Sequence, residues 1–325
     1  ITPGLQSDCL VVDSVNYNIC LDLKSVSGNY EPWMADFGAA KRRWESILKD
    51  DGQSAVNLDP HWKVGREWIA TSLPPLVDDL YISGFMQPYD GQGGVLGMAG
   101  PYFIRTDPQG YKRPIAGYMF FDADDEAWLR RDGIWANTII HEMGHVLGLG
   151  TMWRQNRLHS GSVNDDRYKT NSNAEAAREQ LCPGGRLPIE TLEVAQRIDY
   201  GTAGAHWDEA CLVNELMTGF VGQEMPLSTI TIASLADMGY TVDYSKADPY
   251  GRDNLGNCGD YCPDLTPKRA LRGSTQQKLR FRREVSPNGH KKILQAAAKH
   301  MHKLRSAKPA SLPSDLDYFA ADRLT

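Results

Sequence analysis

Several features that would assign a chain to a class of protein are missing from these 325 residues. No run approaches the ~18 consecutive apolar residues of a membrane-spanning helix, since even residues 225–236 are interrupted by Ser and Thr. The chain begins at Ile1 without a charged start, an apolar segment and a cleavage site, and it has no Asn-x-Ser/Thr glycosylation sequence. We therefore expect a processed chain that is soluble or held to a membrane from outside.

Cysteine is scarce, and its spacing excludes one kind of metal site. The six cysteines form none of the Cys-x-x-Cys pairs of a structural zinc site, and their number is even. Disulfides in an oxidising compartment are therefore favoured over free buried thiols. The cysteines are Cys9, Cys20, Cys182, Cys211, Cys258 and Cys262.

Positive charge is scarce in most of the chain and concentrated at its end. Residues 266–325 carry 14 Lys and Arg against 4 Asp and Glu, which leaves 21 against 37 for residues 1–265. The acidic body would repel nucleic acid, so we expect no nucleic-acid partner for it. The basic extension, with a helical pattern over 291–305, is predicted to be solvated or loosely docked; contact with an anionic surface is the functional alternative.

The spacing of apolar residues predicts both strands and helices. Alternation indicates strands over 16–23, 78–85 and 114–122, and the proline that starts the last of these suits a sheet edge. Spacings of three and four residues indicate helices, the last of them followed by Gly239 in a C-cap position. The expected helices are 33–48, 132–147, 173–181 and 228–238.

Two loop segments suggest binding sites that the sequence does not favour. The glycine-rich run 91–101 is followed by neither Gly-Lys-Ser/Thr nor a helix start, so we expect an irregular loop or a bulged edge instead of a phosphate cradle. In the acidic cluster before the next helix, turn and helix N-terminus chemistry is favoured over a structural Ca²⁺ site. The cluster consists of Asp122, Asp124, Asp125 and Glu126.

The strongest chemical signal is His141-Glu142-Met143-Gly144-His145, within the predicted apolar helix 132–147. Residues four apart lie on one helix face a turn from each other, so both imidazoles can reach one ion. Glu142 is displaced around the helix, toward a water bound to that ion. Two histidines and a glutamate would be costly to bury unpaired, which favours a metal over satisfied core histidines.

A catalytic zinc site requires a third protein ligand. The helix is followed by Gly148, but the last histidine of the short pattern His-Glu-x-x-His-x-x-Gly-x-x-His is replaced by Thr151, a poor zinc ligand. His206 lies in Ala-His-Trp-Asp-Glu, where acidic neighbours could orient its ring. The other candidates are His159, in a polar loop, and Glu209 or Glu215, which would give a two-histidine, one-carboxylate site.

These segments resemble the leishmanolysin family of metzincin zinc peptidases, over roughly residues 16–250. Residues 141–153 (HEMGHVLGLGTMW) resemble that family's helix and its exit, and residues 204–209 (GAHWDE) resemble its third-ligand segment, which follows a long insertion. Residues 214–219 (NELMTG) resemble its Met-turn, whose methionine, here Met217, lies beneath the metal. Residues 93–122 and 230–240 are also similar to the family.

The resemblance implies one catalytic Zn²⁺ held by His141, His145 and His206. It also implies a metzincin-like, two-lobed α+β fold with a twisted mixed sheet and the active-site helix in one lobe, and a mostly irregular and helical second lobe. The corresponding domain boundaries are 1–151 for the N-terminal lobe, 152–265 for the C-terminal lobe and 266–325 for the basic extension.

The predicted activity is that of a zinc endopeptidase acting on polypeptide substrates. A zinc-activated water would attack the scissile carbonyl while Glu142 acts as general base. The strand 115–122 is expected to bind the substrate backbone by adding it to the sheet edge. The resemblance implies that 218–222 line the pocket beyond the cut. The alternatives are a zinc hydrolase with a glutamate ligand and a non-catalytic, metal-stabilised adhesion or binding module, which the intact Glu142 argues against.

The predicted location is extracellular, at the cell surface or in the lumen of the secretory pathway. We predict a Cys182–Cys211 disulfide, because these cysteines flank the third-ligand segment and would tie the insertion to it. Cys258–Cys262 and Cys9–Cys20 are weaker predictions based on proximity in the sequence.

Overall fold

The structure is a computed structural model, and most of the chain between residues 16 and 262 is described in it. The described residues are 16–25, 31–49, 55–58, 63–64, 71–72, 74, 76–93, 95–162, 164–184, 186–191, 202–259, 262 and 316–318. The predicted tail helix 291–305 therefore lies outside the described residues. The predicted Cys9–Cys20 pair lies partly outside them, because Cys9 is not described. No helix among these residues is long and apolar enough to cross a membrane.

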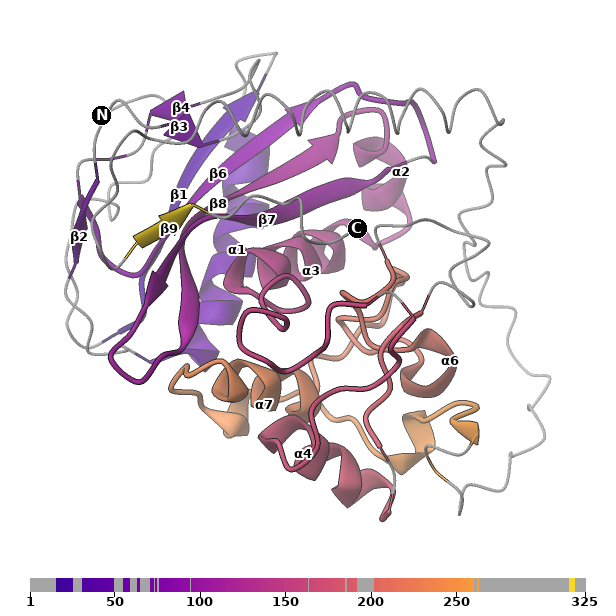
Figure 1. The fold of residues 1–325 in the computed structure, drawn as a ribbon. Helices are drawn as coiled ribbons and strands as arrows, with labels where there is room; N and C mark the ends of the chain where they lie inside the picture. Colours follow the sequence, from indigo (N-terminus) through magenta and orange to yellow (C-terminus); the bar gives the residue numbers. More distant parts are fainter. Residues whose placement is uncertain are drawn as a thin grey trace.

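A mixed sheet of five strands forms the upper part of the molecule in Figure 1. Its order is β1-β6-β8-β7-β9, in which β1, β6 and β8 are parallel and β7 is antiparallel to both β8 and β9. The strands are β1 (Ile19–Ser25), β6 (Leu80–Gln87), β7 (Gly97–Thr106), β8 (Lys112–Asp122) and β9 (Leu316–Tyr318). Two small antiparallel pairs are β2 (Val56–Asn57) with β5 (Leu76–Val77), and β3 (Lys63–Val64) with β4 (Thr71–Ser72).

The predicted strand 114–122 is present as β8, but its predicted position at a sheet edge is wrong. β8 lies inside the sheet, paired with β6 on one side and β7 on the other. Pro114 is tolerated there because it lies opposite Ile104, next to a β-bulge in β7 where the ladder is already irregular. β7 is nearer the edge, since β9 pairs with it only from Phe103 to Arg105.

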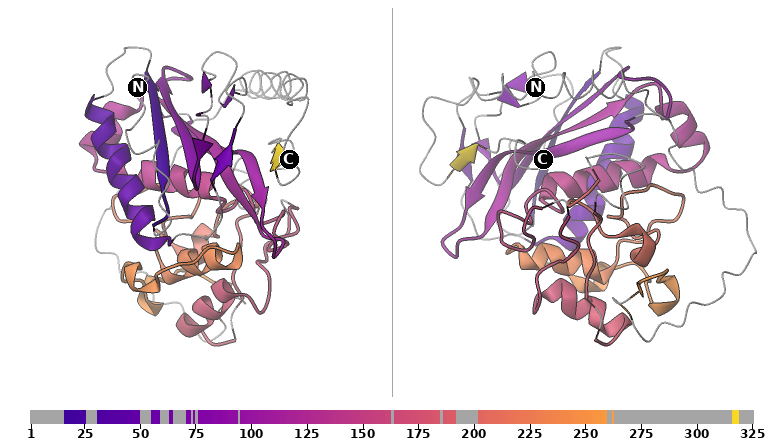
Figure 2. Two further views of the ribbon diagram at one scale, coloured as in Figure 1. Left: turned by 90° about the vertical axis from the view of Figure 1, so that its left-hand side faces the viewer. Right: turned by 45° about the vertical axis from the view of Figure 1, so that its right-hand side comes forward.

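Two helices cover one face of the sheet, α1 (Glu31–Ile47) and α3 (Trp135–Leu147), and the short α2 (Glu126–Arg131) precedes α3 (Figures 1 and 2). Trp44 of α1 and Met143 of α3 are fully buried in one core with Phe121 of β8. On β6, Tyr81 lies in a smaller core, whereas its neighbours Leu80 and Ile82 belong to the first core. Successive side chains of a strand point to opposite faces, so both faces of the sheet carry buried residues.

The lower part of the molecule is built from short helices and irregular segments (Figure 1). Ser172 and Ser228 cap α4 (Asn173–Leu181) and α7 (Thr229–Asp237), because each hydroxyl accepts a backbone N–H from the first turn. Both helices were predicted, as was the left-handed Gly239, whose φ is +87°. The described residues also include α6 (Glu209–Leu212) and the 3₁₀ turns η2 (Tyr244–Lys246) and η3 (Arg252–Asn254).

The disulfides differ from the predicted pairs. Cys182 is bonded to Cys262 and Cys211 to Cys258, so the predictions of Cys182–Cys211 and Cys258–Cys262 are wrong. The cause is the return of the chain after α7 across the lower part of the molecule. The N–H of Gly256 donates to the carbonyl of Cys211, which brings the loop before Cys258 directly against α6. The prediction of Cys258–Cys262 assumed that cysteines close in the sequence pair with each other, whereas each is bonded to a distant segment.

Mass mapping of non-reduced peptides should recover Cys182–Cys262 and Cys211–Cys258. Because these bonds close loops of 80 and 47 residues, reducing both should lower the free energy of unfolding by about 2–5 kcal/mol per bond. A peptide that links Cys182 to Cys211 would contradict this arrangement.

Candidate metal centre

Two glycines determine where the chain goes after α3. Gly148 ends the helix with a φ of +111°, a left-handed conformation that favours glycine. Gly150 also has a positive φ, and a Cβ atom there would lie 2.0 Å from the carbonyl oxygen of Ala205. A side chain at position 150 would therefore displace the segment that carries His206. The sequence contained this signal as a second glycine after the helix.

The three predicted histidines come together at this point. The Nε2 atoms of His141, His145 and His206 are 3.0, 3.0 and 3.2 Å apart in pairs. All three side chains are at least nine-tenths buried. Among the residues that the structure describes, this is the one group of His, Cys, Asp and Glu side chains whose ligand atoms lie close enough to hold a metal ion.

Each imidazole is oriented by a backbone carbonyl. The Nδ1 atom of His141 lies 2.7 Å from the oxygen of Leu216, and that of His145 lies 2.9 Å from the oxygen of Leu149. The Nδ1 atom of His206 lies 2.9 Å from the oxygen of Thr202. A carbonyl can only accept a hydrogen bond, so each Nδ1 carries the proton and donates it.

The three rings are also neutral. Burial lowers the pKa of His141 to about 4 and that of His206 to about 3, and it lowers the pKa of His145 well below its usual value. A neutral imidazole with its proton on Nδ1 presents a lone pair at Nε2. Three lone pairs then face one another at 3.0–3.2 Å with no proton between them, an arrangement that a cation would stabilise.

This donor set fits zinc. Ligand distances of about 2.0–2.1 Å in a tetrahedral site separate nitrogen ligands by about 3.3 Å, close to the distances found here. Imidazole nitrogens suit Zn²⁺, and the carbonyl on each Nδ1 is the usual partner of a metal-bound histidine. Three protein ligands would leave a fourth position for water or substrate.

Glu142 follows His141 on α3 and lies between the helix and the start of β7. A Cβ atom at Gly97 would be 3.2 Å from its Cγ and Cδ atoms. Burial raises the pKa of the Glu142 carboxyl to about 8. The side chain is therefore packed against the start of β7, in a buried setting where its affinity for a proton is high.

The segment of residues 215–218 supports the histidines from below. Leu216 supplies the carbonyl for His141, and Met217 is fully buried, with its Sδ atom 2.9 Å from where a Cβ atom at Gly144 would lie. Glu215 fixes this segment, because its carboxylate accepts bonds from the N–H of Met217 and from the hydroxyls of Ser228 and Thr231. The prediction from sequence did not identify this bracing role of Glu215.

The alternative third ligands do not join the histidines. The ring of His159 lies against the carbonyl of Asp165 and the N–H of Gly161. The hydroxyl of Thr151 donates to the carbonyl of His145. The group of potential ligands found among the described residues contains neither Glu209 nor Glu215.

The acidic cluster after β8 shows the predicted turn chemistry. Asp122 accepts backbone N–H groups from Tyr89, Asp90 and Asp124. Asp125 accepts bonds from the N–H of Gly93 and from the indole of Trp128. A Ca²⁺ site is not supported among the described residues, because this cluster does not bring its ligand atoms together as the histidines do.

Comparison with known proteins identifies similar sequences. The family model described as leishmanolysin matches residues 80–262, more than half of the chain. A leishmanolysin from Leishmania donovani is 31% identical over 204 residues, which cover 59% of this chain and 32% of the relative. The chain therefore spans about a third of the length of the relative that it matches.

Metal analysis of variants should identify the ligands. We expect about one zinc per chain in the wild type and loss of zinc in His206→Ala, because two imidazoles alone bind the ion much more weakly. Thr151→Ala and His159→Ala are the matched controls and should retain zinc, since neither side chain belongs to the group. Full zinc content in His206→Ala would move the assignment to Glu209, Glu215 or His159.

Proposed function

Since the chain belongs to the leishmanolysin family of metallopeptidases, we propose that it is a zinc-dependent endopeptidase acting on polypeptide substrates. The observation that carries this proposal is the convergence of three neutral, oriented imidazoles next to a buried glutamate. We assign His141, His145 and His206 as the ligands of one catalytic zinc. When bound there, zinc would lower the pKa of its water and polarise the scissile carbonyl.

Glu142 is the proposed general base. It follows a ligand on the same helix and lies at the start of β7, so it is on the side from which a substrate would approach. Its raised pKa suits a group that accepts a proton from water and then passes it to the leaving amine. A binding module would not need a carboxylate buried at this cost, which favours catalysis over the adhesion alternative.

The proposed substrate strand is placed differently from the one expected from the sequence. β8 already pairs on both sides, so residues 115–122 have no edge to offer. The edge beside the histidines belongs to β7, where Gly97 lies against Glu142 and a Cβ atom at Gly100 would be 4.0 Å from Thr151. A substrate added to β7 would receive main-chain hydrogen bonds and pass across the metal centre.

We also propose residues 218–222 as the wall of the pocket beyond the cut, the role that the resemblance implies for them. Asn137 ties this segment to α3, because its side-chain amide donates to the carbonyls of Gly222 and Gln223 at 2.9 and 3.0 Å. Gln223 in turn donates to the carbonyl of Asp132. The wall is thus attached to the helix that carries the ligands, which supports a fixed distance between pocket and metal.

The proposed domain boundaries are those of a two-lobed peptidase. Residues 1–151 would form the lobe above the cleft and residues 152–265 the lobe below it, with Met217 as the methionine of the Met-turn and 266–325 as an extension. The two disulfides favour an extracellular, cell-surface or secretory-lumen location.

Glu142→Gln separates catalysis from metal binding. The variant should keep zinc but lose peptide cleavage by a factor of about 10² to 10⁴, because only the proton transfer is removed. The control is Glu179→Gln, an exposed position on α4 that should retain full activity. A Glu142→Gln protein with wild-type cleavage would exclude Glu142 as the base, and a zinc-loaded wild type that cleaves no unfolded protein would favour the binding module.

Asn137→Ala tests the proposed pocket wall. Loss of two hydrogen bonds should loosen residues 218–222, raising KM by about three- to tenfold for substrates with a large side chain after the cut and much less for those with alanine there. Zinc content should not change, since no ligand is touched. The exposed Asn164→Ala is the control, and an equal change for both substrate types would contradict a role in the pocket wall.

A further inference from the structure

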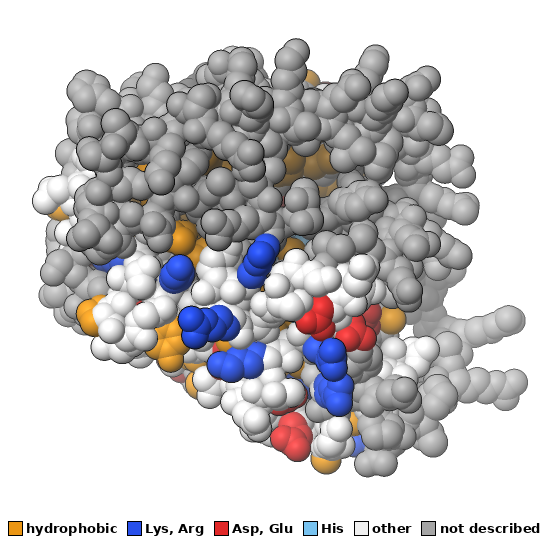
Figure 3. All heavy atoms as spheres, in the orientation of Figure 1, with side chains coloured by type: hydrophobic (Ala, Val, Ile, Leu, Met, Phe, Trp, Pro, Cys, Tyr) orange, Lys and Arg blue, Asp and Glu red, His pale blue; other side chains and the backbone are white. Residues whose placement is uncertain are grey.

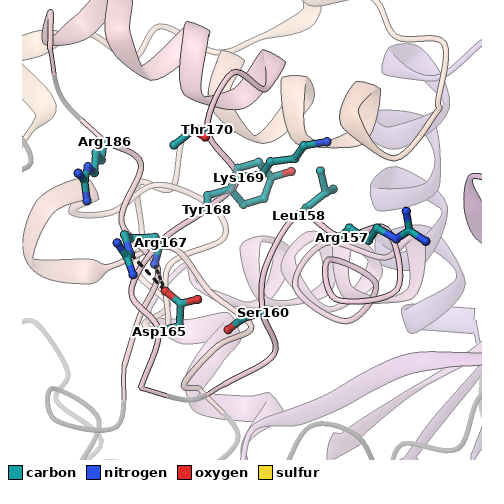
Figure 4. A pocket seen from close by; sticks show the side chains of 9 residues that line it. All are labelled: Arg157, Leu158, Ser160, Asp165, Arg167, Tyr168, Lys169, Thr170 and Arg186. Carbon is teal, nitrogen blue, oxygen red and sulfur yellow. Dashed lines mark hydrogen bonds and ion pairs between the residues drawn. The ribbon is translucent and has the colours of Figure 1, made fainter.

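An open pocket of about 380 Å³ is lined by residues of the segment that joins α3 to α4 and by Arg186, which follows α4 (Figure 4). The proposed chemistry does not use these residues. Four of the residues that line the pocket are cationic, whereas one, Asp165, is acidic. Arg167 is at 3.5 Å from Asp165 and 3.8 Å from Asp166, so its charge is partly balanced. The cationic residues are Arg157, Arg167, Lys169 and Arg186.

The other three charges are not balanced by the described part of the chain. Arg157, Lys169 and Arg186 are all exposed, and none makes an ion pair with a described residue. This group lies on a body in which acidic residues outnumber basic ones by 37 to 21. In Figure 3, several Lys and Arg side chains are visible on the described, lower part of this face, with Asp and Glu side chains among them. Clustered like charges repel one another, so an anionic ligand would stabilise the pocket.

The backbone holds the Arg157 side of the pocket in a defined position. Arg157 itself has a φ of +60°, which residues with a side chain rarely adopt. The preceding Asn156 fixes the turn, because its side chain bonds both the N–H and the carbonyl of Lys112 at 2.9 and 2.8 Å. The turn is therefore strained and anchored, and it holds the unpaired Arg157 in a fixed position at the pocket.

The pocket is close to the metal centre. Arg167 forms a β-bridge with Pro188, and the next residue, Ile189, forms one with Trp207, which follows His206. Two strand spacings of about 4.8 Å place the chain at Arg167 roughly 10 Å from the chain at Trp207. A polypeptide bound at the histidines could therefore reach the pocket with about three extended residues.

The direction of the neighbouring strand indicates which part of the substrate would reach it. β9 pairs antiparallel with β7 and runs from Arg105 toward Phe103. It therefore points toward Gly97, the first residue of β7, where Glu142 lies. A substrate added in the same sense would pair with residues 97–102, the part of the β7 edge that β9 leaves free among the described residues, with its earlier residues at the Tyr102 end. That end of the free edge is on the side of Lys112, where Asn156 and Arg157 lie. Residues before the cut would then lie nearest the pocket.

We propose that this cationic pocket binds an acidic segment of the polypeptide substrate, on the N-terminal side of the scissile bond. The assignment of the ligand to the substrate rests on the proposed endopeptidase function. The planar guanidinium groups of Arg157 and Arg186 can each bind a carboxylate through two parallel hydrogen bonds. Single exposed ion pairs are weak, so the pocket would select segments with several Asp or Glu residues over single ones.

Binding can be measured without cleavage. In the Glu142→Gln protein, fluorescence anisotropy would follow a labelled peptide with four consecutive glutamates. Adding Arg157→Gln, Lys169→Gln and Arg186→Gln should raise its Kd about tenfold. The matched control removes three exposed charges elsewhere, Arg42→Gln, Arg131→Gln and Lys246→Gln, and should change Kd less than about twofold. Thermal unfolding of both triple variants verifies that they fold.

An unchanged Kd in the pocket variant, or an equal loss in the control, would overturn the pocket as an acidic-peptide site. Displacement of the peptide by a sulfated oligosaccharide at much lower concentration would also overturn it, in favour of a glycan site. In the active protein, the three pocket substitutions should raise KM for a peptide with four glutamates at its N-terminal end and leave kcat unchanged. The same peptide with the glutamates at its C-terminal end should be unaffected, and an equal rise for both would contradict the direction proposed here.

Different experimental results would refute the pocket proposal and the proposed endopeptidase function. A wild type that cleaves no peptide, combined with the expected loss of peptide binding, would refute the endopeptidase and leave an acidic-peptide site. A wild type that cleaves peptides, combined with no effect of the pocket substitutions on Kd or KM, would refute the pocket alone.

Discussion

The contact between Gly150 and Ala205 is the constraint on which the candidate metal centre depends. His145 and His206 are separated by 61 positions in the sequence, yet their Nε2 atoms are 3.0 Å apart. The helix must stop at Gly148 and the chain must turn without a side chain at Gly150 for the segment before His206 to lie against it. The histidines can therefore meet only because positions 148 and 150 are glycines without side chains.

The segments below α3 obtain their order from polar and covalent links. Residues 202–218 contain little regular structure, so packing of an amphipathic helix cannot position them. Instead, Glu215 holds the segment below the histidines to the start of α7. Two disulfides tie Cys211 of α6 to Cys258, and Cys182 at the end of α4 to Cys262. The carbonyls of Leu216 and Thr202 that orient His141 and His206 both come from this braced region. A metal ion would add a further link between it and α3, so folding of the lower part and binding of the ion should be coupled.

The sequence predicted what depends on neighbours along the chain. The helix 173–181 agrees with α4, and the capping serine and Gly239 mark the two ends of α7, because caps and helical periodicity are local. The histidine pair was visible as a spacing, and His206 was favoured by its context and by resemblance. The position of β8 and the disulfide pairs were mispredicted, since both depend on where distant segments meet. Pro114 suggested an edge, but a bulge in the partner strand removes that requirement.

Two buried glutamates show why residue type alone could not assign roles at this site. Burial raises the pKa of both Glu142 and Glu215, and the sequence offered each as a metal-site residue. Glu215 is surrounded by donors from Met217, Ser228 and Thr231, whose hydrogen bonds partly offset its burial and lower the pKa. For Glu142 burial is the sole cause of the shift, and its neighbours are a glycine on β7 and the helix that carries the histidines. A carboxylate already satisfied by donors is suited to bracing a fold, whereas one left without them retains its affinity for a proton, which is the property that proton transfer from water requires.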